Sequence, residues 1–539
     1  FEVRRLAEKY PGLRVETGGR RIYPMESADI VVDRTYFPTP AKSDVENGAG
    51  PLTVHVDGIA THVLGWMRSI QREDVAKRPR VSAAGVVDRG WYREGDTVGA
   101  QGIESAKEGA LRGLRGRRII HLDSGSEESI EPIPGADVTL TIDAALQARI
   151  QAVMSPEAGL ARVQAWHASA SETQVQNLVV GTPLTGAAVV LEVDSGEVLA
   201  LVSTPSFTRE DLKKRSEWVW KDAVESPWVN RAIGKPYPPG SVVKPLILSA
   251  AVTEGLHSLD KTIDCTGHLY PDKPTQFRCW VYKQFGRTHN DYLGRGLVAD
   301  EAIAMSCNIF FYTLGRALGP DKLPEWFRKF GIGVTPGWGI GPEFAGTIGG
   351  AGKNGVIETG DATLMGIGQG PVAWTPLHAA DAYATLARGG MFIMPRIVRD
   401  ERPATRRLTL DPRAVDAGLE GLRRAVNDTE IGTGEHLSYT TAMGGGKEKI
   451  FTAPGVSVWG KTGTAEAPDI VADPDGPEGQ PPSTMRSGDH SWFVILVGPE
   501  HGPARYAVAV IMEYAGSGAR VSGPIANQVI MALKAEGYL

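Results

Sequence analysis

Ser241 and Lys244 carry a hydroxyl and an amine three residues apart. In a helix this spacing puts both side chains on one face. Burial disfavours the charged form of lysine, and a neutral lysine amine can remove the proton of a neighbouring serine. The pair therefore predicts a serine nucleophile with a lysine base. On its own, however, the pair also fits a helix cap beside a surface charge.

Two further motifs follow in order. Ser306-Cys-Asn308 precedes an apolar run, and Lys461-Thr-Gly-Thr464 follows a strand-forming stretch. Each motif is weak alone, because Ser306 could simply cap a helix and Ser258-Leu-Asp-Lys261 repeats the first spacing in a loop. The ordered set, with each member in its expected context, favours acyl transfer through a serine.

The segment that must position Ser241 begins with a helix-breaking Pro-Pro-Gly sequence and continues as a buried helix. Pro238, Pro239 and Gly240 cannot lie inside a helix, so we expect the helix to start at about Ser241. The residues that follow Pro245 are apolar nearly all round, which indicates burial on every side. Gly255 is the expected end of this helix.

The remaining pattern predicts an α+β fold in which an antiparallel sheet is flanked by helices. Strands are expected at 138–142, 186–193, 197–203, 491–497 and 506–512, and helices at 1–9, 144–154 and 524–536. Residues 1–135 form the expected N-terminal pedestal, with a charged helix closed by glycines at 102–116 and a linker at 123–136. Residues 136–539 form the expected second domain, with an insertion at 155–185.

Composition narrows the class of protein. The chain has 539 residues, 42% of them hydrophobic and 22% charged, with a formal net charge of -6. These values fit a folded protein with a large core and argue against a nucleic-acid partner. Three cysteines exclude a disulfide scaffold, and no apolar run is long enough to span a membrane. Because the chain begins at Phe1, we expect an anchor or signal upstream.

The motifs and their surroundings resemble class B penicillin-binding proteins, which are monofunctional peptidoglycan D,D-transpeptidases. The resemblance covers nearly the whole chain and includes Asn230-Arg-Ala, Gly366–Gly370, Thr375-Pro-Leu and Asp489–Phe493. The stretches at 10–12, 21–24 and 60–65 resemble the elongation branch more than the division branch. No glycosyltransferase segment is recognisable, which argues against the bifunctional class.

The resemblance implies roles for the first two motifs. Ser241 would attack the carbonyl between the two terminal D-Ala residues of a stem peptide. Lys244, kept near neutral by burial and by the charge of Lys461, would take the hydroxyl proton. Ser306 would relay this proton to the departing D-Ala amine. Asn308 would hold the substrate amide and would itself stay near Lys244.

The third motif is expected to form one wall of the cleft. Lys461, Thr462 and Thr464 would bind the terminal carboxylate of the substrate. Gly463 would let the substrate backbone approach the strand. The backbone amides of Ser241 and Thr464 would form the oxyanion hole. β-Lactams would acylate Ser241.

The implied setting is the extracytoplasmic face of the bacterial inner membrane. No cofactor is required, and nucleic acid is not expected as a partner. The expected partners are lipid-linked stem peptides, β-lactams, a membrane glycosyltransferase and elongation-complex regulators. A β-lactam-hydrolysing enzyme or receptor shares all three motifs, and a catalytically silent scaffold is a further alternative.

The stretch from Gly455 to Thr462 also matches the phosphate-loop pattern. Its middle, Val-Ser-Val-Trp, is stiff and strand-forming, and Pro468 follows too soon for a helix. A P-loop NTPase is therefore a minor alternative.

Cys265 and Cys279 bracket an expected hairpin, and their state is open. They could form a disulfide, remain free thiols or bind zinc, as some elongation-class relatives do. The additional zinc ligands that we considered are Asp264, His268 and His289. Cys307 is expected to be a small packed residue.

Overall fold

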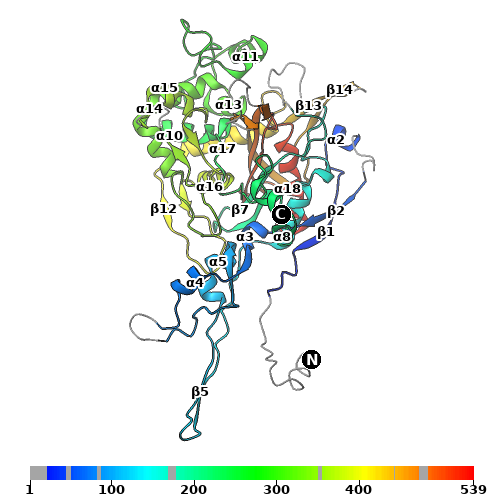
Figure 1. The fold of residues 1–539 in the computed structure, drawn as a ribbon. Coiled ribbons are helices and arrows are strands. Elements are labelled where there is room, and N and C mark those ends of the chain that lie inside the picture. The colour runs from blue at the N-terminus through cyan, green and yellow to red at the C-terminus, as the bar shows by residue number, and fades with distance from the viewer. Residues whose placement is uncertain are drawn as a thin grey trace.

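The computed structural model describes residues 21–43, 50–81, 87–167, 178–349, 355–441, 444–472 and 483–539. The helix expected at 1–9 lies outside the described residues, as does the stretch at 10–12. The structure has a large body that holds most of the chain, and α4 (Arg72–Lys77), α5 (Gly102–Ala106) and β5 (Arg117–Ile120) lie below it (Figure 1). Within the described ranges, no helix has both the length and the apolar character that a membrane span needs.

The body is built on a five-stranded antiparallel sheet, which confirms the expected α+β fold. The strand order is β15 (Val456–Glu466), β18 (Asp489–Pro499), β19 (Tyr506–Met512), β7 (Gly186–Glu192) and β8 (Val198–Thr204). The strand expected at 138–142 is wrong. Only Leu140 makes an isolated bridge, to Val398, while the Thr141 hydroxyl bonds Val198 O, so no continuous ladder forms.

Helices cover both faces of the sheet, which explains why its central strands are apolar on both sides. On one face lie α7 (Ala144–Val153) and α18 (Ser522–Ala535), and a hydrophobic core fills the space beneath them. Asp143 caps α7 as expected, accepting hydrogen bonds from Ala145 N and Leu146 N.

On the other face, α16 (Pro376–Ala387) packs against β19 and β7. Helix α17 (Pro412–Asn427) packs against β15, and α10 (Lys244–Thr253), α13 (Ala299–Ala304), α14 (Asn308–Lys329) and α15 (Thr359–Met365) pack against it or against one another. These helices share the second hydrophobic core. Helix α14 is kinked at Gly319, where φ is 69° and Pro320 follows.

Shorter elements complete the body and frame the site. The short helices are η1 (Pro156–Ala158), α8 (Asp211–Lys214), α9 (Ser216–Lys221), α11 (Trp280–Phe285) and α12 (His289–Leu293). The short strands pair as β9 (Thr347–Ile348) with β10 (Val372–Ala373), β11 (Met391–Ile393) with β12 (Thr405–Arg407), β13 (His436–Thr441) with β14 (Gly444–Lys449), and β16 (Ile470–Ala472) with β17 (Ser483–Arg486).

Among its described residues, the N-terminal part contains three two-stranded sheets and short helices. The strand pairs are β1 (Ser27–Val32) with β2 (Leu52–Asp57), β3 (Trp66–Ser69) with β4 (Thr97–Gln101), and β5 (Arg117–Ile120) with β6 (Glu127–Ile130). The helices are α2 (Thr39–Ser43), α3 (Thr61–Leu64), α4 (Arg72–Lys77), α5 (Gly102–Ala106) and α6 (Glu108–Leu111).

Two expectations for this part are corrected. The single helix expected at 102–116 is split into α5 and α6, because Lys107 has non-helical backbone angles. The linker expected at 123–136 contains β6, which pairs with β5 in a hairpin that projects from the molecule (Figure 1). Most side chains of both strands are exposed, so neither strand shows the alternation of a half-buried strand.

Candidate active site

Ser241 lies in a short 3₁₀ turn, η2 (Gly240–Val243), that leads directly into α10. The α-helix therefore begins at Lys244, three residues later than expected. Pro245 occupies the first turn of α10, where its missing N–H costs nothing. Gly255, with φ of 68°, follows the end of the helix as expected.

The turn that carries Ser241 is held from several sides. Gly240 N donates to Gly368 O at 2.8 Å, and a Cβ atom on Gly368 would lie 2.2 Å from Gly240 O. Trp492 Nε1 donates to Pro238 O, and Tyr383 Oη donates to Val242 O. Gly368 of the glycine-rich stretch 366–370 is thus required for close packing against the Ser241 turn.

Lys244 is completely buried, and its Nζ donates to three acceptors. These are Ser306 O at 2.7 Å, Ser306 Oγ at 3.0 Å and Asn308 Oδ1 at 2.9 Å. Burial lowers the pKa of Lys244 to about 8, although Cys279 and Cys307 act in the opposite direction. The expected lowering of the Lys244 pKa by the charge of Lys461 is not found. Burial and the charge of Lys244 together hold the pKa of Lys461 well below its ordinary value.

The second motif forms a strained turn between α13 and α14. Ser306 has φ of 54°, a left-handed conformation that non-glycine residues rarely adopt. Asn308 is the first residue of α14, and its Nδ2 donates to Arg278 O at 3.4 Å. This geometry turns the Ser306 hydroxyl, its carbonyl and the Asn308 amide toward the one Lys244 amine.

The third motif lies in β15, directly beside the Ser241 turn. A Cβ atom on Gly240 would lie 2.8 Å from Thr464 O. Lys461 is buried, and its Nζ donates to Thr462 O at 3.2 Å and Thr462 Oγ1 at 3.3 Å. The Ser241 turn and the strand of the third motif are therefore adjacent in the fold.

The expected role of Gly463 needs correction. A Cβ atom there would lie 2.9 Å from Trp492 Cβ and 3.0 Å from Val242 Cγ1. The position that a side chain would occupy faces the protein interior. The glycine therefore allows β15 to pack against the Ser241 turn. Thr462 and Thr464, which alternate with it along the strand, face the cleft instead.

A cavity of about 490 Å³ joins the three motifs. Among its lining residues are Ser241, Ser306, Asn308, Thr462 and Thr464. Two carboxylates of this cavity, Glu466 and Asp489, were not expected as site residues, although Asp489 opens one of the stretches that carried the family resemblance. The stretch that matches the phosphate-loop pattern is extended strand in β15, which excludes the phosphate-loop conformation.

A family model confirms the resemblance. The penicillin-binding protein transpeptidase domain matches residues 186–531. The chain belongs to the penicillin-binding protein transpeptidase family. The penicillin-binding protein dimerisation domain matches residues 1–140, so this penicillin-binding protein combines both domains, as class B members do.

Curated relatives support the elongation branch. Peptidoglycan D,D-transpeptidase MrdA of Acinetobacter baumannii is 26% identical over 98% of this chain and 68% of its own length. Peptidoglycan D,D-transpeptidase PbpA of Mycolicibacterium smegmatis is 28% identical over 83% of this chain and 82% of its own.

Solved structures share the fold of this penicillin-binding protein. Pseudomonas aeruginosa PBP2, solved with WCK 5153, superposes with a TM-score of 0.63 at 24% identity, covering 89% of this chain and 91% of that one. Helicobacter pylori PBP2, solved in a complex with MreC, gives a TM-score of 0.66 at 21% identity, covering 92% of this chain and 83% of that one.

Sequence reasoning missed a buried charge cluster behind the Ser241 turn of this penicillin-binding protein. Glu513 Oε1 accepts from Tyr237 Oη at 2.6 Å and from Lys235 Nζ at 2.7 Å, and Arg231 Nε lies 3.2 Å from Oε2. Burial alone would raise the pKa of Glu513, but Arg231 and Lys235 hold it well below its ordinary value. No sequence signal singled out this glutamate, which directly follows β19.

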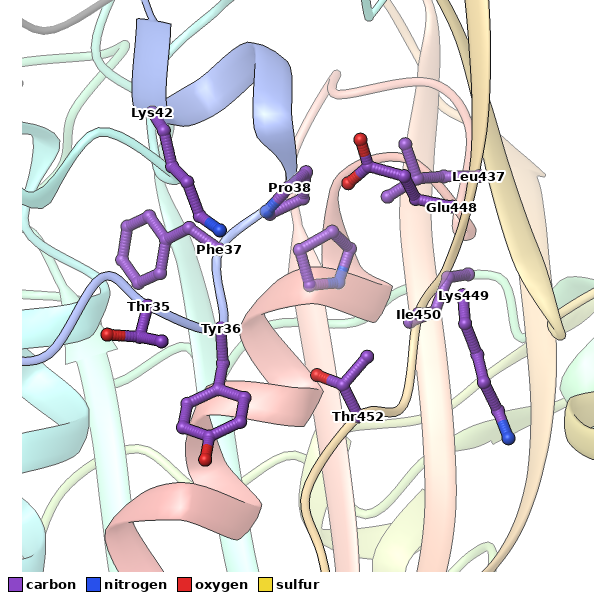
Figure 2. Close-up of a pocket in the computed structure, with 11 residues that line it drawn as sticks. Thr35, Tyr36, Phe37, Pro38, Lys42, Leu437, Glu448, Lys449, Ile450 and Thr452 are labelled. Carbon is purple, nitrogen blue, oxygen red and sulfur yellow. The ribbon is translucent and has the colours of Figure 1, made fainter. Parts of the chain in front are cut away.

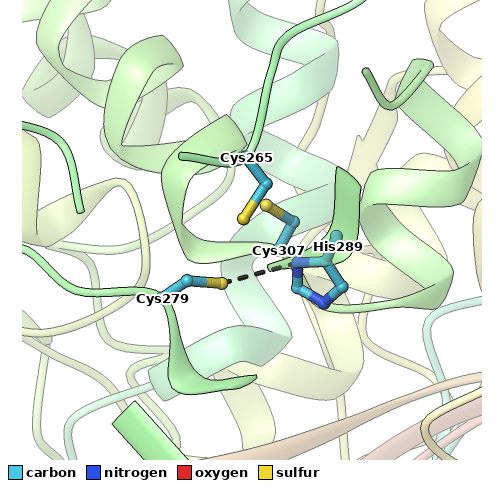
Figure 3. Close-up of side chains that lie close together, drawn as sticks. All are labelled: Cys265, Cys279, His289 and Cys307. Carbon is cyan, nitrogen blue, oxygen red and sulfur yellow. Dashed lines mark hydrogen bonds between the residues drawn. The ribbon is translucent and has the colours of Figure 1, made fainter. Parts of the chain in front are cut away.

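The three cysteines of the chain are free and meet beside the second motif. The thiols of Cys265, Cys279 and Cys307 and the imidazole of His289 point toward one another (Figure 3). Their ligand atoms all lie within 4.8 Å of each other, and all four residues are buried. Cys279 Sγ lies 3.5 Å from His289 Nδ1.

This cluster corrects the ligand set considered from sequence. Asp264 is not a member, because its Oδ1 accepts from Asn290 Nδ2 at 2.8 Å. His268 is also outside the cluster and packs its ring against Tyr282. Cys307, expected to be a packing residue, completes the group.

A second cavity, of about 280 Å³, lies away from the three motifs. Residues of the 35–42 segment face residues 437–452 across it (Figure 2). None of the site residues predicted from sequence lines this cavity.

Proposed function

We propose that this penicillin-binding protein is a peptidoglycan D,D-transpeptidase of the elongation type, the activity that its curated relatives are named for. One observation carries the proposal. Lys244, fully buried and bonded to Ser306 and Asn308, sits beside a cavity that Ser241 and the cleft-facing threonines of β15 share.

In the acylation step, Ser241 Oγ attacks the carbonyl carbon between the two D-Ala residues and Lys244 Nζ takes the hydroxyl proton. The backbone amides of Ser241 and Thr464 stabilise the oxyanion, each by about 3 kcal/mol. Ser306 passes the proton to the departing D-Ala amine. An amine from a second stem peptide then attacks the ester, releases Ser241 and completes the crosslink.

Lys461, Thr462 and Thr464 bind the terminal carboxylate of the donor peptide. Burial beside Lys244 disfavours the charged form of Lys461 in the free protein. A bound carboxylate favours that charged form, because opposite charges at short range raise the pKa of a lysine. Substrate binding therefore restores the positive charge that recognises it.

The direct test of function is crosslinking by the purified protein supplied with lipid-linked substrate and a partner glycosyltransferase. We expect dimeric muropeptides by liquid chromatography and mass spectrometry, and their loss after addition of penicillin. A silent scaffold would give glycan strands without crosslinks. Rapid turnover of penicillin would instead indicate a β-lactam-hydrolysing enzyme.

The proposed partners follow from the same family. Helicobacter pylori PBP2 was solved with MreC, which supports an elongation-complex regulator as a partner of this chain. A membrane glycosyltransferase would supply the glycan strands. We place the protein at the extracytoplasmic face of the inner membrane, where this substrate is found.

We further propose that Cys265, Cys279, Cys307 and His289 bind a structural zinc ion. Three thiolates and one imidazole are a typical donor set for structural zinc, and four ligands leave no open position for catalysis. The ligand atoms already converge, all within 4.8 Å of one another. Because Cys307 lies between Ser306 and Asn308, bound zinc would hold the second motif in place.

This proposal predicts about one zinc ion per chain by elemental mass spectrometry. Removal by a chelator should lower the melting temperature by about 5 °C or more, because metal binding contributes to folding stability. Cys265→Ser should lose the metal, whereas the control Asp264→Asn should keep it. Full zinc retention by Cys265→Ser would contradict the proposed ligand set.

A further inference from the structure

Glu466 and Asp489 lie opposite each other where β15 and β18 meet the cleft. Both line the cavity that contains Ser241. Side chains alternate along a strand, so Glu466 shares the cleft-facing side of Thr464, and cross-strand partners point the same way. At about 3.4 Å per residue, the carboxylate pair begins about 7 Å beyond the oxyanion segment.

This pair is unfavourable in the protein alone. Like charges directly opposite in an antiparallel sheet repel each other. Asp489 is only 7% exposed, and its Oδ2 is buried without a hydrogen-bond partner. Burial and the charge of Glu466 raise the pKa of Asp489 to about 6. A buried, unpaired carboxylate beside a second one is stabilised by a cation that joins them or by taking up a proton.

The protein supplies no such cation in the described ranges. Arg278 and Lys283 line the same cavity, but neither forms an ion pair with Glu466 or Asp489. Lys283 acts on Asp489 only from a distance, by lowering its pKa. The carboxylate pair therefore presents to the cavity a negative charge that no ion pair within the described ranges neutralises.

We propose that Glu466 and Asp489 form a subsite for the protonated primary amine of a stem peptide. In its neutral form, this amine is the nucleophile of crosslinking. This inference rests on the transpeptidase function. Two carboxylates suit an ammonium, which donates three hydrogen bonds, whereas a bound calcium ion takes six or more oxygen ligands. The donor and the acceptor stem peptide both carry such an amine. The occupant of the subsite is therefore one chemical group that can come from either peptide.

The donor arm of the test uses soluble stem pentapeptides with the side-chain amine either free or acetylated. For the wild-type protein we expect kcat/KM for Ser241 acylation to be about tenfold higher with the free amine, as one charge-assisted contact of about 1.4 kcal/mol implies. The double variant Glu466→Gln/Asp489→Asn should remove this preference. Glu500→Gln, a surface carboxylate on the turn after β18, is the matched control.

The acceptor arm follows how the acyl-enzyme partitions between water and an added amine-bearing peptide. If the acceptor ammonium occupies the subsite, the double variant should need about tenfold more acceptor for the same crosslinking. If the double variant changes the result in one arm only, the subsite binds the peptide of that arm. If it changes both results, the subsite binds both peptides. Melting curves verify folding, since removal of like-charge repulsion should not lower stability.

Two outcomes would overturn the proposal in distinguishable ways. If wild-type protein crosslinks peptides and the double variant matches it in both arms, the subsite is wrong and the transpeptidase function stands. Both proposals fail on two joint results: the wild-type protein does not react with the free-amine peptide, and titration calorimetry with the Ser241→Ala variant detects no binding of that peptide.

Discussion

Ser241→Ala should abolish covalent labelling of this protein by fluorescent penicillin. The hydroxyl is the only group of the Ser241 side chain that can form the acyl bond, and alanine cannot replace it. The η2 turn should persist, because its anchors at Gly368, Trp492 and Tyr383 bind backbone atoms of neighbouring residues. Labelling is measured by in-gel fluorescence at saturating penicillin.

A matched control is available in the chain. Ser258 and Lys261 repeat the serine–lysine spacing, but Ser258 is exposed and lies in a loop after α10. Ser258→Ala should therefore label like the wild-type protein. Persistent labelling of Ser241→Ala at the wild-type rate would show that the nucleophile is misassigned.

Lys244→Met should lower the acylation rate constant by about 10² to 10⁴, the range expected for loss of a general base. Methionine approximates the length of the lysine stem but cannot accept the Ser241 proton. Lys261→Met, in the Ser258–Lys261 pair that repeats the spacing, should leave the acylation rate constant unchanged. Stopped-flow measurement of penicillin acylation gives both rates, and melting curves verify that Lys244→Met is folded.

The pH dependence of acylation provides an independent check on Lys244. Only the neutral amine accepts a proton, and its pKa in the free protein is about 8. The wild-type second-order rate constant should thus fall about tenfold per pH unit below 8 and level off above it. Lys244→Met should flatten this profile. An unchanged inflection in the variant would assign it to another group.

The sequence predicted which motifs come together, because each one has a distinctive residue pattern and neighbourhood. It could not predict the direction in which Gly463 faces, since that depends on the phase of β15 relative to the Ser241 turn. The same limit applies to Glu466 and Asp489. They are 23 positions apart in the chain and become neighbours only through the β15–β18 register.

The cysteine cluster shows a different limit. Cys265, Cys279 and His289 lie on irregular segments and short helices, whose path no periodicity determines. Cys307 lies within the second catalytic motif, so its sequence context gave no sign that it also contacts the cysteine cluster. Likewise, the β5–β6 hairpin has little buried face, so its strands carry no alternating pattern.

The central claim is that Ser241 is acylated in a cleft formed by α10, the second motif and β15. Mass spectrometry of the penicillin-treated protein, intact and after proteolysis, tests this claim most directly. We predict a mass increase of one complete penicillin, located on Ser241 and stable for many minutes. An adduct on any other residue, or no adduct at saturating penicillin, would contradict the account.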